Sequence, residues 1–264
     1  MLFKDQMLRE VPLEDSPQRI ISLVPSQTEL LHDLGLGERV VGITKFCLHP
    51  DAWYRGKHRI GGTKSVNFDK VRDLNPDLII GNKEENERSD IESLEESYPL
   101  WMSDIFNLQD ALQMIQSVGE LTDTKMKAEE LIQRIEAEFD AFDTWVEENV
   151  HDRPSVAYFI WKDPDYCAGR NTFIDAMIER CGLQNYMNSE RYPEFEMNGE
   201  EVPDYIFLSS EPFPFKNKHI ENFRKKFPNS KVVLVDGEMF SWYGSRLTLA
   251  PAYFKSLLQE LASN

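Results

Sequence analysis

One segment constrains the fold of this chain more than any other: residues 122–150 contain neither glycine nor proline. The apolar residues of this segment recur at steps of three or four positions, the spacing that gathers side chains on one face of an α-helix. They are Leu131, Ile135, Phe139, Phe142 and Val146. We therefore predict a single helix from Thr122 to Val150, about 40 Å long at ~1.5 Å per residue. A helix of that length matches the dimension of a whole domain and divides the chain into two parts.

The part before this helix alternates short apolar runs with helical patterns. Arg19–Val24 is rich in β-branched residues and predicts a strand; Ser26, with Glu29 three positions on, predicts the start of a helix. That helix ends at Gly35, and Val40–Thr44 predicts the next strand. The later predicted elements are a helix at Phe68–Leu74, a strand at Leu78–Ile80, a helix at Asp90–Glu96 and a strand at Leu100–Ser103. Strands that alternate with helices are typical of a parallel sheet.

The part after the helix repeats this plan. Its predicted strands are Ser155–Ile160, Tyr205–Leu208 and Lys231–Val235, and its predicted helices are Thr172–Cys181, Lys218–Phe227 and Leu247–Leu261. Pro76–Ile80 and Pro203–Phe207 echo one another across the two parts. The sequence thus predicts an α/β fold of two Rossmann-like lobes with parallel sheets, 1–121 and 151–264, joined by one backbone helix, 122–150. Parallel sheets bind ligands at the carboxyl ends of their strands, so we expect the ligand in a cleft between the lobes.

Charge and cysteine content exclude several classes of partner. Asp and Glu total 46 against 29 for Lys and Arg, and a net charge of −17 is expected to repel nucleic acid and anionic lipid surfaces. Cys47, Cys167 and Cys181 share no CxxC spacing, which argues against a disulfide framework or a structural zinc site. Residues 1–17 hold no apolar run that predicts a signal peptide or a membrane span. We expect a cytoplasmic chain without membrane insertion, or a periplasmic one if its true precursor start lies upstream.

The usual catalytic signatures are absent, since the chain contains no GxSxG, GxxxxGK[ST], HExxH or GxGxxG. We therefore predict a binding protein with no catalytic residue, no catalytic cofactor and no protein-held metal. An enzyme acting on a corrinoid or metal chelate is one alternative, with His49 and Glu211 as its titratable groups. An interaction protein with an empty cleft is another. Gly61–Lys64 lacks the context of a phosphate loop and predicts a tight turn.

Several aromatic side chains follow predicted strands or lie in predicted loops, where side chains are less often buried in the core. Broad aromatic surfaces suit a large, flat, partly apolar ligand. Arg170, Arg246 and Lys64 are available for its polar groups. The aromatic residues are Trp161, Tyr166, Tyr192, Trp242 and Tyr243.

Short motifs follow one another in a specific order along nearly the whole chain. They are Arg19–Leu30, Gly42–Thr44, Gly61–Thr63 and Asn75–Ile79 in the first part, and Ala168–Arg170, Tyr192–Glu194 and Ser241–Arg246 in the second. This series resembles the helical-backbone (class III) substrate-binding proteins of ABC importers for cobalamin and for ferric chelates. The resemblance implies a small-molecule metal chelate as ligand, with its metal held by the chelate. Cobalamin is the candidate ligand; a ferric siderophore, heme, or a cytoplasmic carrier role for a corrinoid are the alternatives.

The resemblance also assigns residues by position. Phe46 to His49, with Thr63 and Lys64, would form the wall of the first lobe; Trp161, Tyr166, Tyr192 and Trp242 would form that of the second. Family members carry one acidic residue on each lobe that meets arginines of the membrane permease. Asp69 and one of Glu200 or Glu201 are nearest in position to these. We expect a monomer that docks on an ABC permease.

Overall fold

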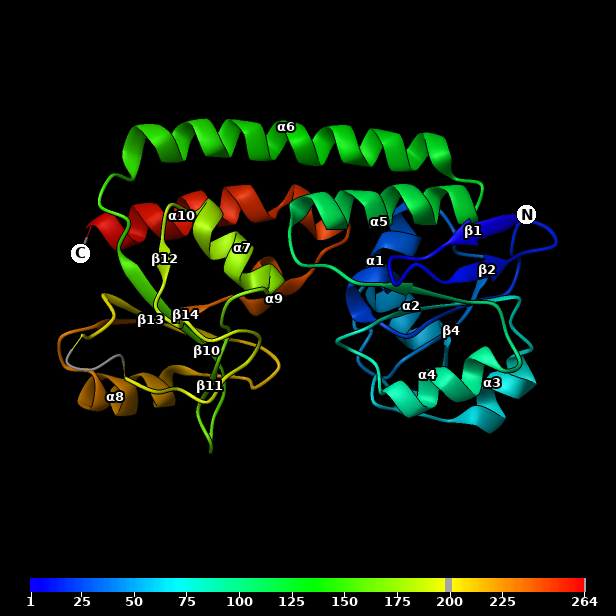
Figure 1. Ribbon diagram of the computed structural model, residues 1–264, viewed down its shortest axis with the longest axis horizontal. Coiled ribbons are helices and arrows are strands. Elements are labelled where there is room, and N and C mark those ends of the chain that lie inside the picture. Colours follow the sequence, from blue (N-terminus) through cyan, green and yellow to red (C-terminus); the bar gives the residue numbers. More distant parts are fainter. Residues whose placement is uncertain (198–200, 264) are drawn as a thin grey trace. The chain divides into compact units, whose positions relative to one another are not determined.

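The computed structural model describes residues 1–197 and 201–263 (Figure 1). Within it the chain forms two compact units. Unit 1 comprises Met1–Ile105, Gln109–Ile135 and Tyr243–Arg246, and unit 2 comprises Phe106–Leu108, Glu136–Trp242 and Leu247–Asn264. The chain therefore enters each unit more than once.

The sheet of unit 1 is parallel throughout. Its strands are β3 (Ile20–Ser22), β4 (Val40–Ile43), β5 (His58–Arg59), β8 (Leu78–Asn82) and β9 (Leu100–Ser103), in the order β5-β4-β3-β8-β9. The order reverses between β3 and β8, which is the doubly wound arrangement of Rossmann-like folds. All residues of β3, β8 and β9 are buried, as expected for parallel strands covered on both faces.

Five helices accompany this sheet: α1 (Pro25–Asp33), α2 (Asp51–Gly56), α3 (Phe68–Leu74), α4 (Arg88–Glu95) and α5 (Leu108–Leu121). Two hairpins complete the part of unit 1 that precedes α5, β1 (Leu2–Lys4) with β2 (Glu10–Pro12) and β6 (Gly61–Gly62) with β7 (Ser65–Val66). The expected start of α1 at Ser26 is wrong. Val24 is the N-cap and Pro25 the first helical residue, because proline lacks the N–H that this position leaves unused.

The sheet of unit 2 is parallel except at one edge. Its strands are β10 (Ser155–Trp161), β11 (Tyr166–Cys167), β12 (Gln184–Asn185), β13 (Tyr205–Ser209) and β14 (Lys231–Val235). β12, β13 and β14 run parallel to β10, while β11 pairs antiparallel with it. The accompanying helices are α7 (Phe173–Arg180), α8 (Asn217–Lys226), α9 (Gly237–Ser241), the short 3-10 helix η1 (Ser245–Thr248) and α10 (Ala250–Ser263). Figure 1 shows α8 on one face of this sheet and α7, α9 and α10 on the other.

A single helix, α6, occupies Lys125–Asn149 of the segment for which one helix is predicted. All five apolar side chains whose spacing predicts it are buried. The helix begins after Asp123, whose φ of 55° interrupts the helical backbone. The division between the units falls within α6, between Ile135 and Glu136.

The echoed Pro-Asp motifs have the same structural role in both units. The carboxylate of Asp77 accepts hydrogen bonds from the backbone N–H groups of Gln18 and Arg19, at 2.7 and 2.8 Å. The carboxylate of Asp204 likewise accepts one from the backbone N–H of Ser155 at 2.7 Å. Each aspartate thus fixes the amino end of the neighbouring strand, β3 or β10, which explains why the motif recurs.

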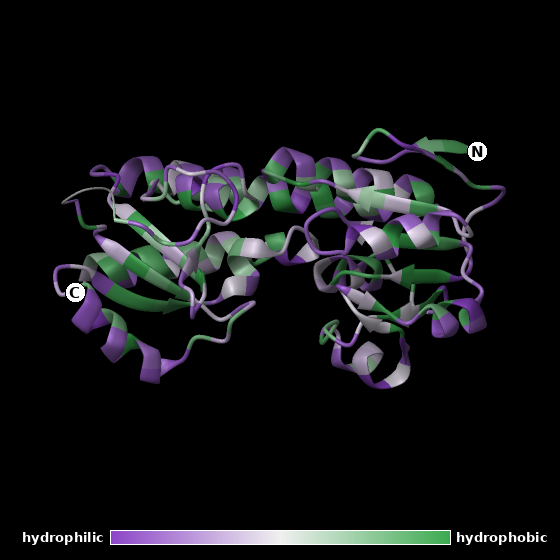
Figure 2. Ribbon diagram, turned by 60° about the horizontal axis from the view of Figure 1, so that its bottom comes forward, coloured by the Kyte–Doolittle hydropathy of each residue, from purple (hydrophilic) through white to green (hydrophobic). Residues whose placement is uncertain are grey.

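The predicted α/β fold with parallel sheets is confirmed. Figure 2 shows the strands largely in the hydrophobic colour and the helices banded with hydrophilic residues, which is the pattern of helices that cover a sheet. Among the helices of residues 1–197 and 201–263, none is both long and apolar enough to cross a membrane.

Candidate functional site

The carboxyl end of β4 in unit 1 leads into a loop with an exposed aromatic side chain. Phe46 and Leu48 are each 51% exposed, and the ammonium group of Lys45 lies 5.0 Å from the Phe46 ring centroid. A Cβ placed on Gly62 would lie 3.2 Å from the Phe46 ring and 3.4 Å from Lys45 Cε. The loop therefore contacts the β6–β7 hairpin, and His49 follows it half-buried.

Thr63 and Lys64 form the two-residue turn of that hairpin, in which Gly62 pairs with Ser65. The tight turn predicted at Gly61–Lys64 is confirmed. Asn86 anchors the turn, because its side-chain N–H donates to the Thr63 carbonyl at 3.0 Å. Lys64 is exposed, whereas Thr63 is half-buried.

A layer of buried polar side chains lies beneath these loops. Gln27 donates to the Ser103 hydroxyl at 2.7 Å, and Asn82 donates to the same hydroxyl at 2.9 Å. The Thr28 hydroxyl lies 3.0 Å from Cys47 Sγ. Burial raises the pKa of the Cys47 thiol, so this group stays protonated at neutral pH. These contacts tie the ends of β8 and β9 to α1 and hold the loops above them.

In unit 2 exposed aromatic side chains lie at the carboxyl end of β10 and on the segment that runs beside β11. Trp161 is 43% exposed, pairs in register with Tyr166 and meets the Phe213 ring edge-on at 5.8 Å. Tyr192 is 37% exposed, with the Arg191 guanidinium 5.9 Å from its ring. The backbone N–H of Cys167 donates to the Pro193 carbonyl at 3.0 Å, so the segment that carries Tyr192 runs beside β11. Three of the predicted aromatics thus belong to one region of unit 2.

Trp242 and Tyr243 differ from these three because they are only 7% and 6% exposed. The Trp242 indole N–H donates to Glu211 Oε1 at 2.9 Å, and the Ser241 hydroxyl donates to the same oxygen at 2.6 Å. Burial raises the pKa of Glu211, and the nearby Glu238 adds to this effect, while both hydrogen bonds oppose it. Trp242 belongs to unit 2 and Tyr243 to unit 1.

Of the three cations predicted to contact the ligand, two form ion pairs within the protein and one is exposed. Arg246 forms two hydrogen bonds with the Glu29 carboxylate, at 2.9 and 2.6 Å, within unit 1. Arg170 pairs with Glu179 at 2.8 Å and with Asp175 at 3.3 Å. Both guanidinium groups are thus held by carboxylates of the protein itself, and Lys64 alone of the three predicted cations stands in an exposed turn.

Sequence reasoning missed Lys45, Phe213 and Arg191, each of which lies beside an exposed aromatic of the site. For Lys45 and Arg191 a signal was available, because each precedes a predicted aromatic residue in the sequence. Phe213 comes close to Trp161 only through the pairing of β10 with β13, which sequence spacing does not reveal.

The predicted docking acids lie on exposed surface where the structure describes them. Asp69 sits on α3 with its side chain 79% exposed and pairs with Arg72 at 2.5 Å. Glu201 is exposed, and its backbone carbonyl accepts a hydrogen bond from the Tyr186 hydroxyl at 2.7 Å. Glu200 lies outside the described residues.

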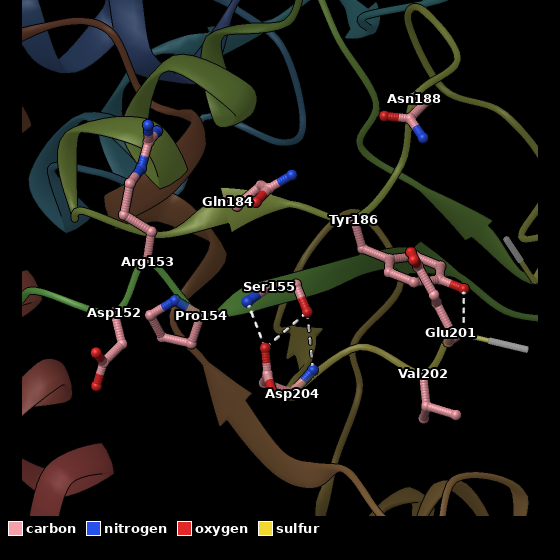
Figure 3. Close-up of a pocket in the computed structure, with 10 residues that line it drawn as sticks. All are labelled: Asp152, Arg153, Pro154, Ser155, Gln184, Tyr186, Asn188, Glu201, Val202 and Asp204. Carbon is pink, nitrogen blue, oxygen red and sulfur yellow. Dashed lines mark hydrogen bonds between the residues drawn. The ribbon is translucent and has the colours of Figure 1, made fainter.

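One pocket of unit 2, of about 390 Å³, lies at the opposite edge of the sheet from the exposed aromatics (Figure 3). It opens at the amino ends of β10, β12 and β13, around Ser155, Gln184 and Asp204. Figure 3 shows the hydrogen bonds between Ser155 and Asp204 and the one between Tyr186 and Glu201 among the lining residues. Ligands of parallel sheets bind at the carboxyl ends of the strands, so this pocket is not the expected ligand site.

No group of three or more His, Cys, Asp or Glu side chains in the described ranges is arranged to hold a metal ion.

Comparison with known proteins gives one family match and three similar individual proteins. Residues 20–228 match the family model described as periplasmic binding protein. An ABC transporter substrate-binding lipoprotein of Bacillus subtilis, itself uncharacterized, is 28% identical over 69% of this chain and 59% of its own length. The vitamin B12-binding protein of Pectobacterium carotovorum is 24% identical over 93% of this chain and 90% of its own length. The solved periplasmic vitamin B12 binding protein of Vibrio cholerae has the same fold, with a TM-score of 0.80 at 19% identity, covering 94% of this chain and 99% of that one.

Proposed function

The chain belongs to the periplasmic binding protein family, and from this premise we propose that it binds cobalamin or a related metal chelate for an ABC importer. The observation that carries the proposal is the family match over residues 20–228, which covers most of both units. Proteins of this family deliver ligands to ABC transporters and are not enzymes. His49 and Glu211 therefore need no catalytic role.

Cobalamin is the first candidate ligand. Relatives named as vitamin B12-binding proteins align with nearly the whole chain, at 24% identity over 254 residues in one case. The exposed rings of Phe46 in unit 1 and of Trp161 and Tyr192 in unit 2 offer the apolar surface that a corrin ring needs. The cobalt would remain inside its macrocycle, so the protein would supply no metal ligand.

A ferric siderophore or heme is the second candidate, and the distribution of cations favours it. Lys45 lies beside Phe46, and Arg191 lies beside Tyr192. Lys64 projects from the hairpin that contacts the same loop. Cations next to aromatic surfaces suit a flat ligand that carries carboxylates or phenolates, whereas the amide groups of cobalamin need no such charge.

The partner that this function requires is an ABC permease. We propose that Asp69 and Glu201 meet basic groups of that permease, and that the chain works as a monomer at the outer face of the membrane. The name of the Bacillus subtilis relative, a lipoprotein, supports that location over the cytoplasm.

Calorimetric titration with cobalamin, heme and a ferric siderophore tests the proposed ligand class. We expect one of the three to bind with a dissociation constant of about 1 μM or lower. This value corresponds to a standard binding free energy of about −8 kcal/mol. Native mass spectrometry of the protein as purified would identify a ligand that remains bound. If none of the three binds to a folded sample, the proposed ligand class is wrong.

A further inference from the structure

Helix α8 and the residues that flank it carry a charge opposite to that of the chain. The chain as a whole has a net charge of −17. The segment 216–231 contains six Lys or Arg residues and a single acid, Glu221. Such a local reversal is a separate feature from the acidic surface that keeps the protein soluble.

Four of these six cations are exposed and form no ion pair within the described residues. Lys226 pairs with Asp165 at 2.6 Å, and Lys231 donates to the Leu261 carbonyl at the end of α10 at 2.9 Å. The other four are exposed and form no ion pair with any residue in the described ranges. They are Lys216, Lys218, Arg224 and Lys225.

The packing of α8 fixes the direction in which these cations point. Phe223 is 3% exposed and meets the Phe159 ring edge-on at 4.8 Å, and His219 is 9% exposed on the same side. Lys218 and Lys225 are seven positions apart, which places them together on the solvent side of the helix. The pKa of His219 is lowered, first by burial and then by Lys218, Lys162 and Lys216, which agrees with a positive local field.

We propose that this side of α8 binds anionic lipid head groups at a membrane surface. Protein interfaces draw most of their affinity from buried aromatic or apolar anchors, and the large apolar side chains of α8 face the core instead. Lipid head groups need only positive charge close to the surface. Asp165 lies against α8 but is paired with Lys226. Glu221 is the single acid of segment 216–231 against six cations, so the segment keeps a net positive charge. The contact is peripheral and goes beyond ligand binding.

Vesicle sedimentation tests the proposal, with the full chain mixed with vesicles of phosphatidylcholine or of phosphatidylcholine containing phosphatidylglycerol. We expect binding to the anionic vesicles only, and release at high salt. Each exposed cation contributes about five-fold to such partitioning, so the double variant Lys218→Glu/Lys225→Glu should lose at least about 25-fold. The neutral variant Lys218→Gln/Lys225→Gln provides a second measurement if charge reversal perturbs the helix.

The matched control is Arg55→Glu/Arg88→Glu, which changes the net charge equally on two exposed helical positions of unit 1. This control should sediment with anionic vesicles nearly as the unchanged protein does. Equal losses in both double variants would assign the effect to net charge and overturn the proposal. Absence of binding to anionic vesicles, or equal binding to both vesicle types, would overturn it as well. A calorimetric titration with the chelate should be unaffected by the Lys218 and Lys225 changes, which separates this proposal from ligand binding.

Discussion

At the scale of residues, burial separates two tryptophans that sequence reasoning treats alike. Trp161 follows a strand and is 43% exposed, whereas Trp242 is 7% exposed and donates its indole N–H to Glu211. A ligand can gain apolar contact from the first ring without rearrangement. The second ring has a structural partner within its own unit, so its exposed surface is small.

Replacing Trp161 by alanine should weaken chelate binding by about 1 to 3 kcal/mol, the scale of a large apolar contact. Calorimetric titration measures this change. Trp145→Ala is the control, because that ring stacks on Phe142 on α6 and is no part of the proposed site. Equal affinities of the unchanged protein and the Trp161 variant would remove this ring from the site.

Glu211 gives a prediction about pH. Burial raises its pKa above the ordinary 4.5, so the folded protein binds this proton more tightly than the unfolded chain. The contribution of Glu211 to the free energy of unfolding is therefore largest at pH values below its ordinary pKa. This contribution is lost as the pH rises through the raised pKa of the folded state. Glu211→Gln keeps an oxygen acceptor for Ser241 and Trp242 but cannot ionise.

Urea denaturation of both proteins from about pH 4 to about pH 7 checks this prediction. The stability of the unchanged protein, relative to the Glu211→Gln variant, should decline across that range. Parallel curves would show that the pKa of Glu211 is the same in the folded and unfolded states.

At the scale of elements, the segment Tyr243–Arg246 returns to pack on α1 and belongs to unit 1. Gly244 allows this packing, since a Cβ there would lie 2.6 Å from the Ser26 carbonyl oxygen and 3.4 Å from Leu30 Cβ. The Arg246–Glu29 ion pair, with side chains 12% and 19% exposed, fastens the segment. A short segment remote in sequence is thus an integral part of the first unit.

Gly244→Ala should destabilise the fold by about 1 to 3 kcal/mol, because backbone atoms of α1 must move to admit the methyl group. Gly56→Ala at the end of α2 is the control, since a Cβ there meets nothing within 4 Å. Chemical denaturation of the two variants compares them directly. Similar stabilities would mean that the contact between Gly244 and α1 relaxes without cost.

At the scale of the whole molecule, the net negative charge coexists with local groups of positive charge. Surface acids dominate the chain, yet Lys45 and Arg191 accompany the exposed aromatic rings and α8 is basic. The docking proposal concerns two particular carboxylates within this acidic background. Exposed ion pairs contribute only about 0 to 1 kcal/mol each, but two of them can orient a complex and speed its formation.

Reversing both charges, Asp69→Lys with Glu201→Lys, should impair capture of the cognate permease and leave chelate affinity unchanged. A pull-down at low salt, where electrostatic contributions are greatest, measures the first effect and a ligand titration the second. Asp51→Lys with Glu92→Lys is the charge-matched control on exposed positions of α2 and α4. Capture that is undiminished relative to this control would contradict the docking role.

The sequence by itself predicted most of the helices, the main strands and the family of this protein. The 3.6-residue period of residues 131–146 predicts α6, and apolar runs bounded by turn residues predict the main strands, because burial of one face leaves a local periodic pattern. The helices α2, α5 and α9 were missed. The turn at Thr63–Lys64 was also predictable, since adjacent glycines mark it.

Only the tertiary structure decided which side chains are already engaged. Arg246 and Glu29 are 217 positions apart, and nothing in the local sequence of either residue indicates the other. The same holds for Trp242 with Glu211 and for Asp77 with Arg19. Periodicity records which face of an element is buried, but a hydrogen-bond partner depends on which remote segments meet in space. For that reason the sequence indicated aromatic and cationic candidates, and the fold separated the exposed ones from those that hold it together.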